Sequence, residues 1–370
     1  MNVPCCFGSR GLLCGEPGEN RNKMDKPRAG VTVCSRAVFG KQEVNGMPQK
    51  LSQKDSTALY FVKVMSSLTV IASHISVISD ASPTRYLITS LWDMMSTTSI
   101  GCFFIVGGIL YSRSNGDSGR FWKRKLKTIG LPWLVCAVLS YVYRYAYGHS
   151  KGLWEFFPWA IGYGNWMYFL PVYVFCFAFF KPIWDKPGWL WGSVALTVGT
   201  LLVETIVGAS RIPWLADYQN PLNWVGFFGL GILLRRRNLT WSKWFTALCV
   251  VCAGVFGVLV YRGRIFNFFH VYDMMLTVST FFIVMTVGRW LADTRLSGGI
   301  CWIGGSTFCI YLYHIICLMP VKRRFPEGFI KDAFLPVIGL AIMLLLIEIG
   351  KAITRKLPFG DKIRMMVGLR

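Results

Sequence analysis

Apolar runs recur along this chain, and they constrain its fold more than any other feature. Each run is about twenty residues long, the length of a helix that crosses a bilayer, and short basic loops separate the runs between Leu59 and Ile353. Hydrophobic residues make up 54% of the 370 residues even with glycine left out, whereas soluble domains reach about 45–50% with glycine counted. We therefore expect an all-α, polytopic integral membrane protein.

The apolar runs predict about ten transmembrane helices in one bundle. Their approximate ranges are 59–79, 91–111, 129–147, 166–183, 189–207, 222–234, 243–261, 273–292, 300–320 and 334–353. With the amino terminus in the cytoplasm, most Lys and Arg residues beyond the first span fall on the cytoplasmic side, as the charge rule for membrane proteins requires. We expect a multi-pass protein of the inner (plasma) membrane with both termini in the cytoplasm.

One loop departs from this charge distribution. It carries Lys322, Arg323, Arg324 and Lys331, and the predicted topology places it outside. Two interpretations stay open: either one span is miscounted, or this loop serves an anionic substrate. The remaining positive charge lies in loops at the membrane surface, where it fits topology and contacts with anionic lipids. The net charge of +22 therefore does not predict a nucleic-acid partner.

Composition divides the chain into three parts. Residues 1–57 are polar and show no period, so we expect them to be disordered, and they lack the basic start, apolar core and cleavage site of a signal peptide. Met24 and Met47 are alternative starts within this segment. Residues 58–354 form the predicted membrane domain, and residues 355–370 form a basic cytoplasmic tail.

Cysteines are frequent, but their positions predict no special chemistry. Most of the twelve lie in or beside apolar spans, where cysteine behaves as a small hydrophobic residue. Cys249 and Cys252 form a CxxC motif, yet no second ligand pair accompanies it. The sequence therefore predicts no disulfide framework, no metal site and no bound cofactor.

Two ionisable residues, Lys63 and His74, lie inside the first apolar run. Their spacing puts both side chains on one helix face, roughly 16 Å apart. Ionisable groups inside a span are costly and usually face a protein interior or a watery cavity, so the pair predicts a buried site for an anionic ligand and a proton. The alternative is that Lys63 extends to the lipid headgroups and His74 forms a hydrogen bond between helices.

Five sequence elements follow one another along the membrane region. They are Lys63 and His74 with ten residues between them, FFIVGGILYSR at 103–113, KRKLKTIGLPWL at 123–134, NWMYFLPVYVF at 165–175 and STFCIYLYHIICL at 306–318. Their order and spacing resemble the acyltransferase type-3 family, which includes bacterial O-acetyltransferases of polysaccharides. The resemblance covers about 59–353, with two departures: Lys63 stands where the family carries arginine, and Gly107 where serine is usual.

The resemblance implies transfer of an acyl group, usually acetyl, from acetyl-CoA as cosubstrate to a hydroxyl of a cell-surface or lipid-linked glycan. A hydroxyl attacks only after a base with a pKa near 7 takes its proton, so His74 is the predicted general base, with a transient acyl-histidine as the variant. Lys63, Arg113 and Arg124 are expected to hold the donor. The alternative for Arg124 is a purely topological charge.

Three further residues are candidates for the acceptor site or for positioning. His314 lies in the ninth span, where it either contacts substrate or packs; Glu348 lies in the tenth span, and Asp80 in the outer loop next to His74. A competing class is a secondary transporter or flippase of an anionic or polyprenyl-linked solute, which would use Lys63, His74 and Glu348 for coupling. The sequence indicates no particular oligomeric state.

Overall fold

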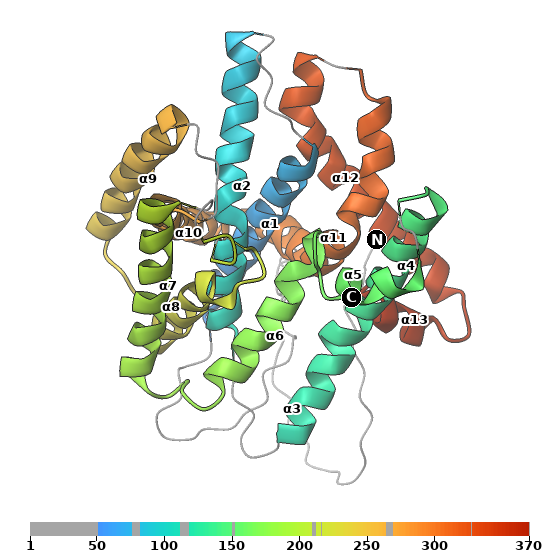
Figure 1. Ribbon diagram of the computed structural model, residues 1–370, viewed down its shortest axis with the longest axis horizontal. Helices are drawn as coiled ribbons and strands as arrows, with labels where there is room; N and C mark the ends of the chain where they lie inside the picture. Colours follow the sequence, from blue (N-terminus) through green and yellow to red (C-terminus); the bar gives the residue numbers. More distant parts are fainter. Residues whose placement is uncertain are drawn as a thin grey trace, which may run out of the picture. The chain divides into compact units, whose positions relative to one another are not determined.

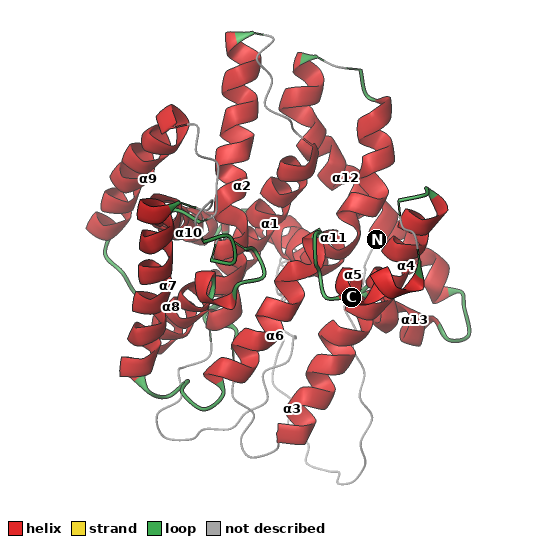
Figure 2. Cartoon of the chain, in the orientation of Figure 1, coloured by secondary structure: helices red, strands yellow, loops and turns green. Residues whose placement is uncertain are grey.

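The computed structural model of the chain describes residues 51–75, 82–111, 118–149, 152–208, 212–215, 217–263, 269–326 and 328–369. All of them belong to the compact unit Cys34–Arg370. Within these ranges the chain forms helices, turns and loops and contains no strand, which confirms the predicted all-α class (Figure 2). Asp80, Arg113 and the segment predicted to be disordered up to residue 50 lie outside the described residues.

Thirteen α-helices make up the described part of the chain (Figure 1). They are α1 (Gln53–Ile75), α2 (Pro83–Ile109), α3 (Ser118–Lys125), α4 (Leu131–Ala146), α5 (Phe156–Ala160), α6 (Phe169–Phe180), α7 (Pro187–Val207), α8 (Val225–Arg236), α9 (Lys243–Gly263), α10 (Val271–Leu291), α11 (Ser297–Arg324), α12 (Phe329–Arg355) and α13 (Gly360–Val367). Each predicted span overlaps one of these helices. A π-helix, Leu126–Gly130, joins α3 to α4.

Six helical segments among the described residues are long and apolar enough to cross a membrane. They are Gln53–Ile75, Gly119–Ala146, Pro187–Val207, Val271–Leu291, Ser297–Arg324 and Phe329–Arg355. Two shorter apolar segments, Trp166–Phe180 and Lys243–Leu259, accompany them. These helices fit a polytopic membrane protein, whereas the count of about ten spans stays a prediction.

Helix α1 packs against α2, α10, α11 and α12 (Figure 1). It runs parallel to α11, because contacts between the two helices advance in the same direction along both. The Thr57 hydroxyl lies 3.8 Å from the Cys301 sulfur near the helix starts, and near the helix ends the rings of His74 and His314 lie side by side. The carboxyl-terminal parts of α1 and α11 therefore share one end of the bundle.

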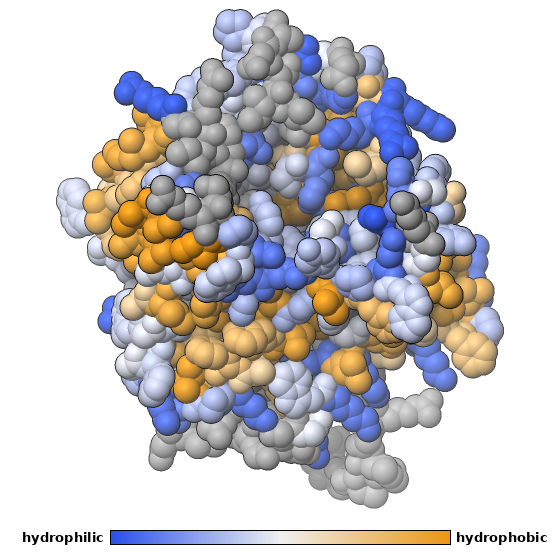
Figure 3. Space-filling view, in the orientation of Figure 1, coloured by the Kyte–Doolittle hydropathy of each residue, from blue (hydrophilic) through white to orange (hydrophobic). Residues whose placement is uncertain are grey.

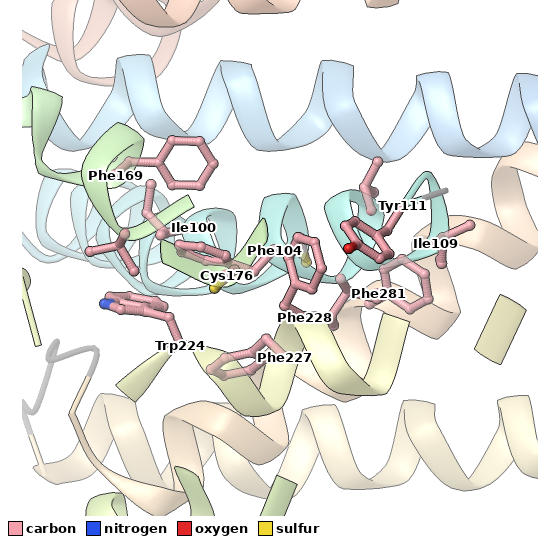
Figure 4. Close-up of a cluster of buried hydrophobic side chains, with 14 of the residues drawn as sticks. Ile100, Phe104, Ile109, Tyr111, Phe169, Cys176, Trp224, Phe227, Phe228 and Phe281 are labelled. Atoms are coloured by element: carbon pink, nitrogen blue, oxygen red, sulfur yellow. The ribbon is translucent and has the colours of Figure 1, made fainter. Parts of the chain in front are cut away.

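An aromatic core fills the space around α2 and α8 (Figure 4). Phe104 of α2 stacks on Trp224 with ring centroids 5.4 Å apart. The backbones of the two helices also touch: a Cβ added to Gly108 would lie 2.0 Å from the Phe228 carbonyl oxygen, and one added to Gly231 would lie 2.1 Å from the Ile105 carbonyl oxygen. Only glycine permits this approach.

Ion pairs and aromatic contacts identify two opposite ends of the bundle. At the start of α2, Arg85 pairs with Asp332 at the start of α12, with Nε and Oδ2 2.5 Å apart. Beyond the other terminus of α2, the Tyr111 ring contacts Phe121 of α3 at 6.5 Å. We call these the Arg85 end and the α3 end. Because α2 has 27 residues, they are about 40 Å apart.

Helix α1 begins at the α3 end and points toward the Arg85 end. Arg289, near the end of α10, bonds the Asp55 carboxylate at the start of α1 over 2.7 Å and the Leu239 carbonyl just after α8 over 2.5 Å. Helix α8 runs in the same direction as α2, because Phe104 contacts Trp224 and the later Tyr111 contacts Phe228. It therefore also ends at the α3 end. His74, near the carboxyl terminus of α1, therefore lies toward the Arg85 end.

The outer faces of several helices are apolar and exposed. Helix α9 shows this most plainly, with more than half of the Val251 and Leu248 side-chain surfaces accessible. Figure 3 shows hydrophobic side chains across much of one face, with hydrophilic ones toward both ends and also in its middle. Apolar patches this large on a single chain are typical of surfaces that face lipid or another partner.

Candidate functional site

Three polar side chains form a stripe along α1. Lys63, Ser67 and His74 are four and seven residues apart, so they lie on nearly the same face of the helix. Ser67 is buried, and its hydroxyl has no hydrogen-bond partner. Lys63 and His74 are half-buried. The stripe therefore runs from the middle of the bundle toward the Arg85 end, with the unpartnered Ser67 hydroxyl between Lys63 and His74.

Lys63 lies where α1 and α11 approach each other. Its ammonium group is 4.9 Å from the centroid of the Tyr60 ring, one turn earlier on α1, a distance at which the ring attracts a cation. The Tyr60 ring packs directly on Gly304 of α11, because a Cβ at Gly304 would lie 2.6 Å from the ring. The lysine is thus held beside a close contact of the two parallel helices.

His74 and His314 form the centre of the site. Their ring centroids are 5.1 Å apart, and the planes are tilted by 44°. His314 is only 1% exposed, whereas His74 retains partial access. The sequence proposed each histidine separately, and the parallel packing of α1 against α11 brings them together.

The hydrogen bonds of His314 determine which nitrogen carries its proton. Nδ1 lies 2.7 Å from the Tyr311 carbonyl oxygen and 3.2 Å from that of Ile310. Carbonyl oxygens only accept, so Nδ1 must be the donor, and Nε2 of the neutral ring then carries a lone pair. Nε2 is buried and has no hydrogen-bond partner. A free acceptor therefore lies inside the bundle next to His74.

An aromatic wall supports the turn of α11 that carries His314. The Trp166 ring lies 6.4 Å from the His314 ring, and its indole N–H donates to the Leu312 carbonyl over 3.2 Å. In return, the Tyr311 hydroxyl donates to the Trp166 carbonyl. These reciprocal bonds connect the 310-helix Trp166–Tyr168 to α11 and hold His314 in place.

A second lysine borders the pair on the Arg85 side. The ammonium group of Lys322, in the last turn of α11, donates to the His74 carbonyl over 3.0 Å. This carbonyl lies in the last turn of α1 as described, and a cation near a helix carboxyl terminus is favourable. The site thus has a lysine on each side of the histidine pair along the bundle.

The remaining predicted residues lie elsewhere. Arg124 is exposed on α3. The Glu348 carboxylate accepts from the Lys351 ammonium over 2.9 Å and from the Trp302 indole over 3.3 Å, near the carboxyl-terminal part of α12. Arg113 and Asp80 fall outside the described ranges. The structure therefore unites His74 with His314, and places Glu348 in a separate ion pair.

Sequence reasoning missed two buried polar groups. Ser67 lies on the same helix face as Lys63 and His74, and this spacing was the available signal. Asp273, in the first turn of α10, is 1% exposed, and neither carboxylate oxygen has a hydrogen-bond partner. It lay at the first residue of a predicted span, so it was not counted as intramembrane. Within the described ranges, no group of three or more His, Cys, Asp or Glu residues could hold a metal ion.

Comparison with known proteins adds the class of this chain. A family model described as an acyltransferase domain matches residues 57–350, a range that includes most of α1, all of α11 and both histidines. No curated protein and no solved structure matches the chain. The family match therefore gives the assignment, and the matched range contains the histidine pair.

Proposed function

The chain belongs to the acyltransferase type-3 family, and from this membership we propose that it transfers an acetyl or other acyl group from acyl-CoA to a hydroxyl of a cell-surface or lipid-linked glycan. Family and apolar helices together make it a membrane acyltransferase. The donor and the acceptor are the parts of this proposal that experiments must test.

The histidine pair is the observation that carries the proposal. A hydroxyl group attacks a thioester carbonyl when a base removes its proton. In the proposed step, His74 takes the proton from the acceptor hydroxyl, and the hydroxyl oxygen forms the new ester bond. The carbon–sulfur bond of the thioester breaks, and the CoA thiolate leaves with the proton that His74 returns.

His314 acts as a positioning residue in this scheme. When His74 has taken the proton, its imidazolium ring carries two N–H donors. The lone pair on His314 Nε2 is available to accept one of them, because Nδ1 already donates to backbone carbonyls. A buried acceptor beside the imidazolium stabilises the charge that appears during the reaction.

The polar stripe on α1 supports one orientation of the bound acyl-CoA donor. Lys63 and His74 are roughly 16 Å apart along the helix, so an extended donor arm can place a phosphate near Lys63 and its thioester near His74. The free Ser67 hydroxyl between them is suited to an amide of that arm. Arg124 on α3 would supply further positive charge for phosphates at the α3 end. Arg113, which lies outside the described residues, is the other predicted donor contact.

This arrangement predicts sidedness. We propose that the α3 end faces the cytoplasm of an inner-membrane protein with about ten spans and both termini inside. In a variant without native cysteines, a cysteine at Arg120 should resist an impermeant thiol reagent in intact cells, whereas one at Arg324 should react. The opposite labelling pattern would place the donor on the wrong side.

The enzyme proposal is tested with purified, reconstituted protein. Release of free CoA from acetyl-CoA, coupled to the appearance of an acetylated acceptor, would support it. Mass spectrometry of surface glycans from a deletion strain would identify the acceptor. Counterflow of a solute without CoA release would instead favour the transporter, although Glu348, which that alternative requires, pairs with Lys351 on its own helix.

A further inference from the structure

The last turn of α11 carries three consecutive cations, Lys322, Arg323 and Arg324, which we call the α11 basic cluster. The cluster lies at the Arg85 end, because a short segment joins α11 to the start of α12, where Asp332 pairs with Arg85 of α2. This end is opposite to α3 and its basic residues. Membrane proteins concentrate Lys and Arg on the cytoplasmic side, so topology does not explain a basic cluster at the other end.

The cluster begins directly beside the histidine pair. Lys322 donates to the His74 carbonyl over 3.0 Å. Arg324 is ten residues beyond His314 on the same helix, a rise of about 15 Å. Pro320 lies inside this stretch and removes one backbone hydrogen bond of the helix. The last turn of α11 therefore places positive charge between the Arg85 end and His74.

One acid that the structure describes at this end, Asp332 at the start of α12, is already engaged. Asp332 is buried, and its carboxylate accepts from Arg85 over 2.5 Å. Arg323 and Arg324 are both exposed, and neither forms an ion pair with any residue that the structure describes. Guanidinium groups bind carboxylates and phosphates through two parallel hydrogen bonds. Two exposed guanidinium groups on the same turn of α11 as Lys322 thus offer a site for an anion.

We propose that the acceptor of this enzyme is anionic, and that the α11 basic cluster holds its phosphate or carboxylate while one of its hydroxyl groups reaches His74. The inference rests on the proposed function and names the class of its acceptor. A sugar linked through a phosphate and an acidic sugar share this chemistry. Acyl transfer itself is unchanged: the hydroxyl proton goes to His74 and leaves with the CoA thiol.

Binding can be measured separately from catalysis. The full chain is purified in neutral detergent and saturated with CoA, so that added anions cannot occupy the donor site. The probes are glucose 1-phosphate, glucuronate and methyl glucoside, and the readout is the ligand-dependent shift of the thermal transition, which reports affinity. We expect stabilisation by at least one of the two anions and none by methyl glucoside. A response to only one anion distinguishes a phosphate from a carboxylate.

Matched variants locate the effect. Arg323→Gln/Arg324→Gln should weaken anion binding about tenfold or more, because charge-assisted hydrogen bonds are lost. Arg355→Gln/Lys356→Gln removes the same charge from exposed positions at the end of α12 and should bind the anion like the wild type. Equal loss in both variants, no loss in the first, or equal stabilisation by methyl glucoside would overturn the inference.

Two further outcomes distinguish an anionic acceptor from lipid headgroup binding and from failure of the proposed enzyme activity. Stabilisation by phosphatidylglycerol vesicles that disappears in Arg323→Gln/Arg324→Gln, without a response to either sugar anion, would assign the cluster to lipid headgroups and overturn the inference. If a sugar anion binds as expected but no acylated product forms from acetyl-CoA, the anion site stands and the proposed enzyme activity fails.

Discussion

Two helix contacts in this bundle are built in opposite ways. Between α2 and α8, glycines bring the backbones together, and aromatic rings such as Phe104 and Trp224 fill the remaining space. Between α1 and α11, the contact contains a histidine pair, and the hydroxyl of Ser67 and Nε2 of His314 are buried without partners. The α2–α8 contact consists of close backbones and packed rings, whereas the α1–α11 contact includes buried polar atoms without hydrogen-bond partners.

The α2–α8 contact is suited to stabilising the bundle, whereas the α1–α11 contact is suited to binding a ligand. Helix association in membranes relies on close packing of small residues, and the α2–α8 contact provides this. A buried polar group without a partner costs about 1–3 kcal/mol, so the α1–α11 contact is less stable than an apolar one would be. Groups left unsatisfied inside the protein are available to a ligand, and both of these lie beside His74 or on its helix face.

The largest expected effect is at His74. His74→Ala should lower turnover by about 10²–10⁴-fold, the usual contribution of a general base, while the protein inserts and binds acetyl-CoA as before. His74→Gln should not restore turnover, because an amide keeps a hydrogen bond but accepts no proton at neutral pH. The rate should also fall as the solution becomes acidic enough to protonate the imidazole. Turnover is measured at matched membrane levels.

A structural histidine would give the reverse pattern. In that case Gln would restore function, and Ala would mainly lower the amount of protein in the membrane. His149→Gln serves as the control, because His149 lies in a loop after α4 and should leave turnover unchanged.

Lys63 has the next largest expected effect. Lys63→Ala should raise the KM for acetyl-CoA by an amount equivalent to roughly 2–5 kcal/mol, the cost of leaving a buried charged contact unpaired. Lys63→Arg should be tolerated, because arginine is what the family resemblance places in this position. Initial rates over a range of acetyl-CoA concentrations provide the measurement. An unchanged KM in Lys63→Ala would mean that the lysine only reaches toward headgroups or packs on Tyr60.

The sequence could predict which side chains share a helix face, but not which helices distant in the chain pack together. Lys63 and His74 share one helix, so their common face followed from spacing alone. The pairing of His74 with His314 required the parallel packing of α1 and α11, which are more than 200 residues apart in the chain, and no local pattern specifies that neighbour. Glu348 shows the converse case, because its partner Lys351 is only three residues away on the same helix, a pairing that local spacing alone can indicate.

Gly231 tests the packed contact with a smaller effect. Gly231→Leu should destabilise the protein by about 1–3 kcal/mol or more, because the new side chain overlaps the backbone of α2. We expect a lower thermal transition and less protein in the membrane, with nearly unchanged turnover for each folded molecule. Gly254→Leu on α9 is the matched control, because a Cβ there meets no atom within 4 Å. Equal loss in both variants would show that close α2–α8 packing is not what stabilises the bundle.

Ser67 gives the smallest effect and the sharpest test of the contrast. Its hydroxyl has no partner to lose, so Ser67→Ala should leave the thermal transition unchanged or raise it. If this hydroxyl binds the donor arm, the KM for acetyl-CoA should rise by the value of one hydrogen bond, about 0.5–1.5 kcal/mol. Thr69→Val is the control, and it should give the opposite result. The Thr69 hydroxyl lies 2.5 Å from the Ser99 hydroxyl of α2, so its loss should lower the stability of the protein by about 0.6–1.7 kcal/mol. The KM for acetyl-CoA should not change. A wild-type KM in Ser67→Ala would restrict the donor contacts on α1 to Lys63 and His74. The buried Ser67 hydroxyl would then lower stability without binding the donor.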